Sequence, residues 1–93
     1  MVSMSKNGSL LMLNAPASRI FKDADRVLLL FDADERRLAI RPADPDDERG
    51  FKLNHMPSGA NISCRTFAEH YKIERGGQWE LSEEADLYCA SVN

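Results

Sequence analysis

The sequence predicts a small α+β domain in which two short helices lie against a compact, barrel-like sheet. Short apolar runs bounded by Pro, Gly and acidic residues recur along the chain, which is typical of strands. Two other stretches place apolar residues at helical spacing, and the order strand, helix, hairpin occurs twice. With 93 residues the chain is a single domain, and because so short a chain buries a limited core, we expect a homo-oligomer.

The first half spans residues 9–42 and follows a small polar stretch, residues 1–8, that we expect to be a mobile arm. The apolar run SLLMLN predicts a strand over residues 9–14. Its last residue, Asn14, is a good helix N-cap, and the apolar spacing that follows predicts a short helix over residues 15–22.

Residues 25–32 and 36–41 are predicted to form a hairpin, because apolar runs flank the acidic turn DADE. In the second strand apolar and basic residues alternate, which places Arg37 and Arg41 on a solvent face. The first strand carries three consecutive leucines and cannot alternate in this way. It is therefore expected to be a central strand covered on both faces, in a barrel or at an interface.

An acidic linker, residues 43–50, is expected to separate the halves, because prolines interrupt strand pairing and the acidic residues favour solvent. The second half, residues 51–93, begins with the strand FKLNHM and a turn or loop, PSGAN. Ser63 is expected to cap a second helix that reaches Ile73 and ends at RGG. QWEL and DLYCASV then predict a hairpin around the turn SEEA.

The two halves also share their spacing. Asn14 precedes Leu38 by 24 residues, and Ser63 precedes Leu87 by 24 residues as well. A tandem β-α-β-β arrangement would make the chain its own pseudo-dimer. Interleaved halves would close a barrel that covers both faces of the leucine strand.

Bulk composition excludes several classes of protein. Hydrophobic residues make up 43% and charged residues 29%, which is ordinary for a folded domain. The longest apolar run is far too short to cross a membrane and the N-terminal segment lacks the apolar core of a signal peptide, so we expect no membrane association and a cytoplasmic location. Neither Cys64 nor Cys89 has a second Cys or a His at ligand spacing, so neither a metal site nor a cofactor is expected.

Cys64 raises the one enzymatic alternative, because a thiol in the first turn of a helix gains thiolate character. His70 lies six residues further along the same helix and cannot reach it there, and His55 would have to arrive from the preceding strand. A small packed residue is the favoured interpretation, and we expect that the protein is not an enzyme. Trp79 is likewise interpreted as core, with a partner anchor as the alternative.

The segment LMLNAPASRIFKDADRVLLLFDADERRLAIRP, residues 11–42, resembles the swapped-hairpin motif of AbrB-type regulators. It shares a strand, a short helix and an acid-preceded hairpin whose second strand ends in a basic residue. The resemblance implies a barrel built from two interleaved motifs, from two chains or from one tandem MraZ-like chain. It also implies DNA contacts near the first strand and helix, at the positions of Arg19 and Lys22.

Clustered cations are what phosphate contacts require, and affinity rises with the number of phosphates neutralised. The candidate DNA-binding residues are Lys6, Arg19, Lys22, Arg37 and Arg41. The first predicted function is therefore a DNA-binding transcriptional regulator or antitoxin-like protein of AbrB-type shape, with duplex DNA as its partner. Because the net charge is −3, a solvated mixed-charge surface is the competing interpretation of these cations. The alternative function is a protein-interaction or oligomerisation module that uses the paired strands or an edge.

Overall fold

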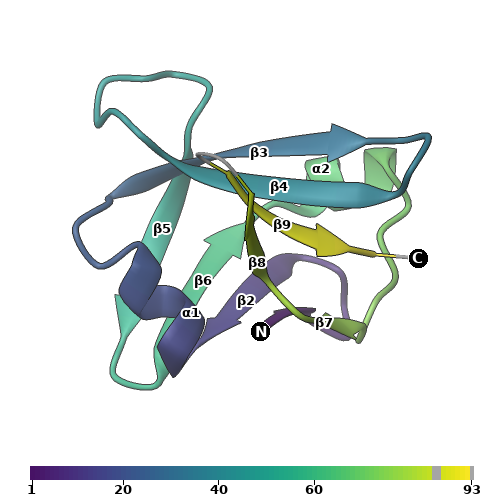
Figure 1. The fold of residues 1–93 in the computed structure, drawn as a ribbon, viewed down its shortest axis with the longest axis horizontal. Helices are drawn as coiled ribbons and strands as arrows, with labels where there is room; N and C mark the ends of the chain where they lie inside the picture. The colour runs from purple at the N-terminus through teal and green to yellow at the C-terminus, as the bar shows by residue number, and fades with distance from the viewer. Residues whose placement is uncertain (85–86, 93) are drawn as a thin grey trace.

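Nine strands form one antiparallel sheet that curls into a half-barrel in this computed structural model, which describes residues 1–84 and 87–92 (Figure 1). The strands are β1 (Val2–Met4), β2 (Leu10–Asn14), β3 (Arg26–Asp32), β4 (Arg37–Ala43), β5 (Phe51–Met56), β6 (Gly59–Ser63), β7 (Gln78–Trp79), β8 (Ser82–Glu84) and β9 (Leu87–Ser91). Two short helices, α1 (Ala15–Ile20) and α2 (Arg65–His70), complete the domain. The barrel-like shape and the two helices agree with the sequence prediction, although the structure is mostly β.

The elements of the first half lie where the sequence predicts them. The Asn14 side chain accepts a hydrogen bond from the backbone N–H of Ala17 at 3.1 Å and so caps α1, as expected. Helix α1 packs on β2 and β6 and buries Ala17, and Phe21, directly after the helix, is buried with its ring edge-on to Tyr88 of β9. Strands β3 and β4 pair as the predicted hairpin, with Asp32 opposite Arg37 at the turn.

The prediction of a mobile arm at residues 1–8 is wrong. Residues Val2–Met4 form β1, which pairs with β2, and the side chains of Val2 and Met4 are buried in the core. Without β1, strand β2 would have one unpaired edge. The apolar residues at every second position of this short segment are enough to hold β1 against that edge.

The second half differs from the prediction in three places. The expected loop PSGAN is largely strand, because β6 begins at Gly59 and pairs with both β2 and β5. The helix cap is Cys64, with no side-chain hydrogen bond, and the expected cap Ser63 ends β6. The expected turn SEEA contains β8, which pairs with β9, while Gln78 and Trp79 of QWEL pair with β1. Residue 85 of SEEA and residue 86 of DLYCASV lie outside the described residues.

The acidic segment after β4 is a loop, as predicted, but it begins later. Strand β4 runs on through Pro42 to Ala43, and a proline is tolerated there because β9 pairs with β4 only from Arg37 to Ile40. The loop projects from the body of the molecule between β4 and β5 (Figure 1). Asp47 organises it by accepting hydrogen bonds from the backbone and the side chain of Arg49.

The sheet order is β7-β1-β2-β6-β5-β3-β4-β9-β8, so in the described part of the chain the sheet ends at β7 and β8. These two edge strands contain two and three residues and follow each other closely in sequence. Trp79 of β7 is half-buried against the core, as the core interpretation of this residue expected. No helix in the described ranges has the length and apolar character needed to span a bilayer.

Candidate interaction surfaces

The three consecutive leucines of β3 are only partly covered. Leu29 lies in the core, and Leu28 on the opposite face of the strand is also buried, with 8% of its surface exposed. Leu30, on the same face as Leu28, is 45% exposed. The sequence prediction that both faces of this strand are covered therefore holds for Leu28 and Leu29 and fails for Leu30.

We call the face that carries Leu28 and Leu30 the outer face of β3, β4 and β9. Its residues are Arg26, Leu28, Leu30, Asp32, Arg37, Ala39, Arg41, Ala43, Leu87, Cys89 and Ser91. Three of them, Leu28, Ala39 and Cys89, are buried yet lie outside the core cluster. The expected solvent face of β4 is thus apolar at its centre, because Ala39 lies between its cross-strand neighbours Leu30 and Cys89.

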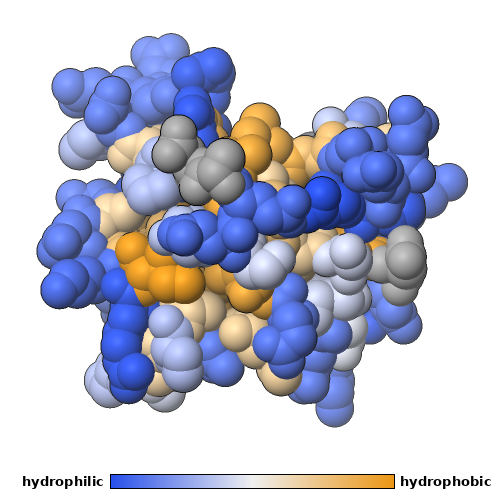
Figure 2. Space-filling view, viewed as in Figure 1, coloured by the Kyte–Doolittle hydropathy of each residue, from blue (hydrophilic) through white to orange (hydrophobic). Residues whose placement is uncertain are grey.

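A groove of about 280 Å³ opens along this outer face beside Leu30, Ala39 and Leu87. A second hollow of about 430 Å³, bordered by Trp79 and Ser82, adjoins it, and Arg37 and Cys89 line both. Apolar side chains reach the surface over β3 in Figure 2, next to hydrophilic ones. An apolar strip with a charged rim is the composition of a protein-interaction surface.

The five predicted DNA-binding residues do not share one surface of free cations. Arg37 forms an ion pair with Glu84 of β8. Arg41 is exposed near the acidic loop, where its charge joins the hydrogen bonds from Arg49 in holding the pKa of Asp47 below its usual range. Arg37 is therefore offset by a carboxylate, whereas Arg41 acts on Asp47 more weakly than Arg49 does.

The other three predicted cations are exposed elsewhere. Arg19 and Lys22 border a hollow of about 230 Å³ between the end of α1 and the end of β4. Lys6 lies in the turn between β1 and β2, which is a different part of the fold from the end of α1 that carries Arg19 and Lys22. Arg19 and Lys22 thus line one hollow, and Lys6 is not among the residues that line it.

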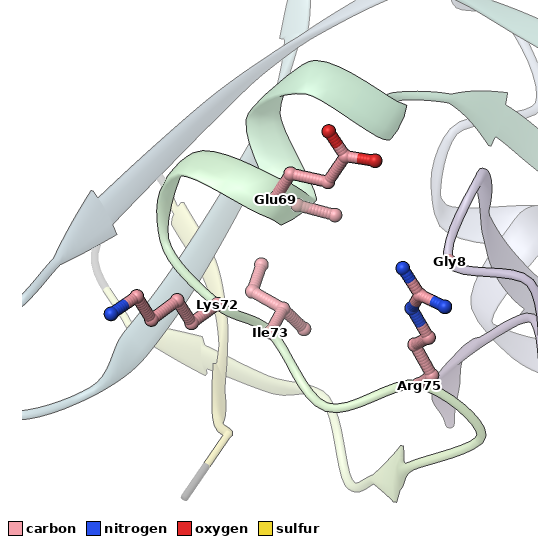
Figure 3. A pocket seen from close by; sticks show the side chains of 6 residues that line it. Gly8, Glu69, Lys72, Ile73 and Arg75 are labelled. Carbon is pink, nitrogen blue, oxygen red and sulfur yellow. The ribbon is translucent and has the colours of Figure 1, made fainter.

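The sequence prediction missed a second pair of cations, Lys72 and Arg75, which follow α2. They line a hollow of about 310 Å³ together with Glu69 and Ile73. Figure 3 shows the side chains of Glu69 and Arg75 pointing into this space from opposite sides, while Lys72 points away. Because a carboxylate faces the guanidinium, the hollow is not a strongly positive site for an anion.

Arg36, between β3 and β4, has a structural role. Its backbone adopts φ 55°, and its guanidinium donates hydrogen bonds to the carbonyl oxygens of Tyr71 at 2.6 Å and Lys72 at 3.0 Å. The same guanidinium lies 5.0 Å from the centre of the Phe31 ring. It therefore joins the β3–β4 turn to the end of α2 and is occupied by these contacts.

Cys64 is a packed residue, as the favoured interpretation held. Its side chain is buried at the start of α2, and burial raises the pKa of the thiol, although a hydrogen bond with the backbone of Leu11 acts the other way. His55 contacts the carbonyl oxygen of Ala24, and the His70 ring packs edge-on against Tyr71. Both cysteines are free and buried, and no group of three metal-ligating side chains occurs within the described ranges.

Comparisons of the chain with protein-family models, curated proteins and solved structures found no significant match. The resemblance to AbrB-type and MraZ-type regulators therefore stays a hypothesis that depends on residues 11–42 alone. Any functional inference has to come from the surfaces described above.

Proposed function

We propose that this protein is a non-enzymatic protein-interaction module that binds through the outer face of β3, β4 and β9. The observation that carries the proposal is Leu30, which is 45% exposed in the middle of an otherwise covered apolar row. Leu30 stands beside a groove that Ala39 and Leu87 also line, so a partner seated in this groove would cover it. The grooves on both sides of Arg37 supply the hollows into which a partner's side chains fit.

We also propose that the domain is built from two tandem halves, β1-β2-α1-β3-β4 and β5-β6-α2-β8-β9. Two six-residue helices that start at Ala15 and Arg65 support this, as do the antiparallel pairs β2–β6 and β4–β9, which join equivalent strands. The strand order can be read as a ring in which β7 stands between β8 and β1. If β1 is exchanged with β5, β2 with β6, β3 with β8 and β4 with β9, the order of these eight strands is the same read in the opposite direction. Each half would then leave apolar surface uncovered without the other, as in the pseudo-dimer expected from the sequence.

A photo-reactive amino acid placed at position 30 tests the interaction proposal. In cells that produce the protein naturally, position 30 should cross-link to protein, and excess unlabelled protein should compete. A Leu30→Asp competitor should not. The matched control is position 12, because Met12 is 37% exposed and lies on the outside of β2, in the other part of the sheet. Equal cross-linking from both positions, or none from position 30, would refute the proposal.

Binding of duplex DNA is the second candidate, and one observation favours it. Arg19 and Lys22 are both exposed and line one hollow at the end of α1. The ion pair of Arg37 with Glu84 and the net charge of −3 make this the weaker proposal.

Electrophoretic mobility at low salt tests DNA binding. A shift should appear with random duplex DNA, weaken steeply as salt rises, and be lost in the double variant Arg19→Ala and Lys22→Ala. Arg37→Ala is the control, since that side chain already pairs with Glu84 and should leave the shift unchanged. A complete absence of any shift at low salt would exclude this candidate.

A further inference from the structure

We infer that Asn7 is a site of spontaneous modification, where the side-chain amide is lost and an aspartate or an isoaspartate takes its place, and that Arg75 slows this reaction. Three features of the turn between β1 and β2 point to it. They are the residue pair Asn7–Gly8, the hydrogen bonds of the Asn7 side chain, and the cover over Gly8.

The reaction is an acyl transfer within the chain. The backbone nitrogen of Gly8 attacks the side-chain carbon Cγ of Asn7 and gives its proton to a base in solution, while the amide group takes up a proton and leaves as ammonia. Water then opens the five-membered succinimide that remains. Opening beside Cγ restores the main chain and gives aspartate. Opening beside the original backbone carbonyl gives isoaspartate, whose main chain has one extra carbon.

Asn7 is the only asparagine in the described ranges that precedes a glycine. The other three, Asn14, Asn54 and Asn61, precede alanine, histidine and isoleucine. A side chain on the following residue hinders the approach of its nitrogen to the asparagine amide, and Gly8 has none. The other three are also held in regular structure, since Asn14 caps α1 and Asn54 bonds to Asn61 across two paired strands.

The hydrogen bonds at Asn7 favour the attack on its side chain. Its oxygen Oδ1 accepts a hydrogen bond from Ser5 Oγ at 2.8 Å, and from the backbone nitrogen and Oγ of Ser9 at 3.1 and 2.6 Å. Donors aimed at a carbonyl oxygen stabilise the negative charge that it gains when a nucleophile adds to its carbon. The bond from the Ser9 backbone also closes an Asx turn, a small ring that contains both Cγ of Asn7 and the Gly8 nitrogen.

The attacking nitrogen, in contrast, is restrained. Gly8 donates a hydrogen bond to the carbonyl oxygen of Ser5 at 3.0 Å, and it is buried although Asn7 is exposed. A Cβ at Gly8 would lie 3.0 Å from Nε and 3.3 Å from Cγ of Arg75, so this side chain covers the glycine. Figure 3 shows Arg75 beside the turn that carries Gly8. The turn has to open before the nitrogen can attack, and Arg75 makes this opening rarer.

The two products differ in their effect on β1. The carboxylate of aspartate accepts the same hydrogen bonds as the amide oxygen, so the turn is kept. Isoaspartate lengthens the main chain inside a turn that is closed by the hydrogen bond from Ser5 N–H to the Leu10 carbonyl oxygen at 2.8 Å. Because this turn sets the register of β1 on β2, the extra carbon should loosen β1 and its buried side chains, Val2 and Met4.

Incubation of the purified protein in mildly alkaline buffer, followed by peptide mapping with mass spectrometry, tests the inference. Asn7 should be converted before the other three asparagines, and Arg75→Ala should convert it several-fold faster. Lys72→Ala is the matched control, because Lys72 lines the same hollow but points away from it, and it should leave the rate unchanged (Figure 3). Earlier conversion of another asparagine, no conversion of Asn7, or equal rates in the two variants would overturn the inference.

The rates at Asn54 and Asn61 in the same samples separate a local effect of Arg75 from a general loss of stability. They should not change in Arg75→Ala. A rise at all three positions would show that the variant loosens the whole fold, and the role given to Arg75 would be wrong.

The modified protein tests the effect on β1. Ion-exchange chromatography isolates it, since both products carry an additional negative charge, and Asn7→Asp supplies the aspartate form alone. Asn7→Asp should unfold at the same urea concentration as the unmodified protein, whereas the fraction that contains isoaspartate should unfold at a lower one. Equal unfolding of the two modified forms would show that the longer turn does not loosen β1.

Discussion

Replacing Arg36 tests how the β3–β4 hairpin is fixed to α2. In Arg36→Ala the carbonyl oxygens of Tyr71 and Lys72 lose a charged donor. Hydrogen bonds from charged groups contribute about 1.5–3 kcal/mol each, and partial exposure places these two near the lower end. Including the contact with Phe31, we expect a loss of about 2–4 kcal/mol, a large share of the stability of a domain this small.

The backbone of Arg36 gives a second, opposite expectation. At φ 55° a residue with a Cβ is strained by about 1–2 kcal/mol relative to glycine. Arg36→Gly removes the same side chain as Arg36→Ala but relieves that strain. It should therefore be more stable than Arg36→Ala by about 1 kcal/mol.

Urea unfolding followed by the fluorescence of Trp79, the single tryptophan, measures both effects. Arg37→Ala is the matched control, because its ion pair with Glu84 is partly exposed and such pairs contribute at most about 1 kcal/mol. If Arg36→Ala is no less stable than Arg37→Ala, the guanidinium does not hold the hairpin to α2. If the glycine variant is not the more stable of the two, strain at this position is the wrong explanation.

Three further predictions address the core, the sheet and the two halves. Burial raises the pKa of Cys64, so the stability that this thiol contributes is complete below the pKa of a free thiol and is lost as pH rises through the higher pKa of the folded state. Cys64→Ala should remove this alkaline decline in the free energy of unfolding. An unchanged decline would contradict the prediction. Gly59→Ala should lower the free energy of unfolding by more than about 3 kcal/mol, because a Cβ there would collide with the carbonyl oxygen of Leu13. Gly76→Ala has open space around it and should cost only about 1 kcal/mol. Similar unfolding midpoints of the two variants would refute the contrast. A protease site inserted in the loop after Ala43 should be cleaved without dissociation, because β2–β6, β3–β5 and β4–β9 pair across the cut; separation of the fragments in gel filtration without denaturant would show that the halves do not hold each other.

Local signals in the sequence predicted the first half well. Asn14 followed by Pro16 marks a helix start by residue type alone, and the acidic turn between two apolar runs marks a hairpin. Both features depend on neighbours within a few residues, which is why they could be located without tertiary information.

The second half could not be predicted to the same degree, because its strands depend on distant partners. Gly59 and Ala60 have little intrinsic strand preference, and β6 exists because β2 and β5 lie on either side of it. Trp79 of β7 pairs with Val2 of β1, 77 positions earlier in the sequence, and not with the neighbouring β9. Glu83 and Glu84 read as a turn, yet pairing with β9 makes them a strand.

The only sequence signal of the candidate surface is the run of three leucines in β3, which does not fit the alternation of a strand with one buried face. Three leucines in a row cannot all lie in one core, and this signal pointed to β3 correctly. It could not tell which leucine is left exposed, because that depends on Ala39 and Cys89 from two other strands. The ion pair of Arg37 could not be predicted for a related reason, because its partner Glu84 comes from β8, which the sequence did not indicate as a strand.

The two edge strands have a consequence for how far self-association can go. A sheet extends into fibres when a long, flat edge recruits another strand, but here the edges are β7 with two residues and β8 with three, and β8 carries Glu83 and Glu84. Growth in the plane of the sheet is therefore blocked at both ends. A chain with these edges can therefore carry an exposed Leu30 on the face of its sheet without offering a long edge to which further strands could add.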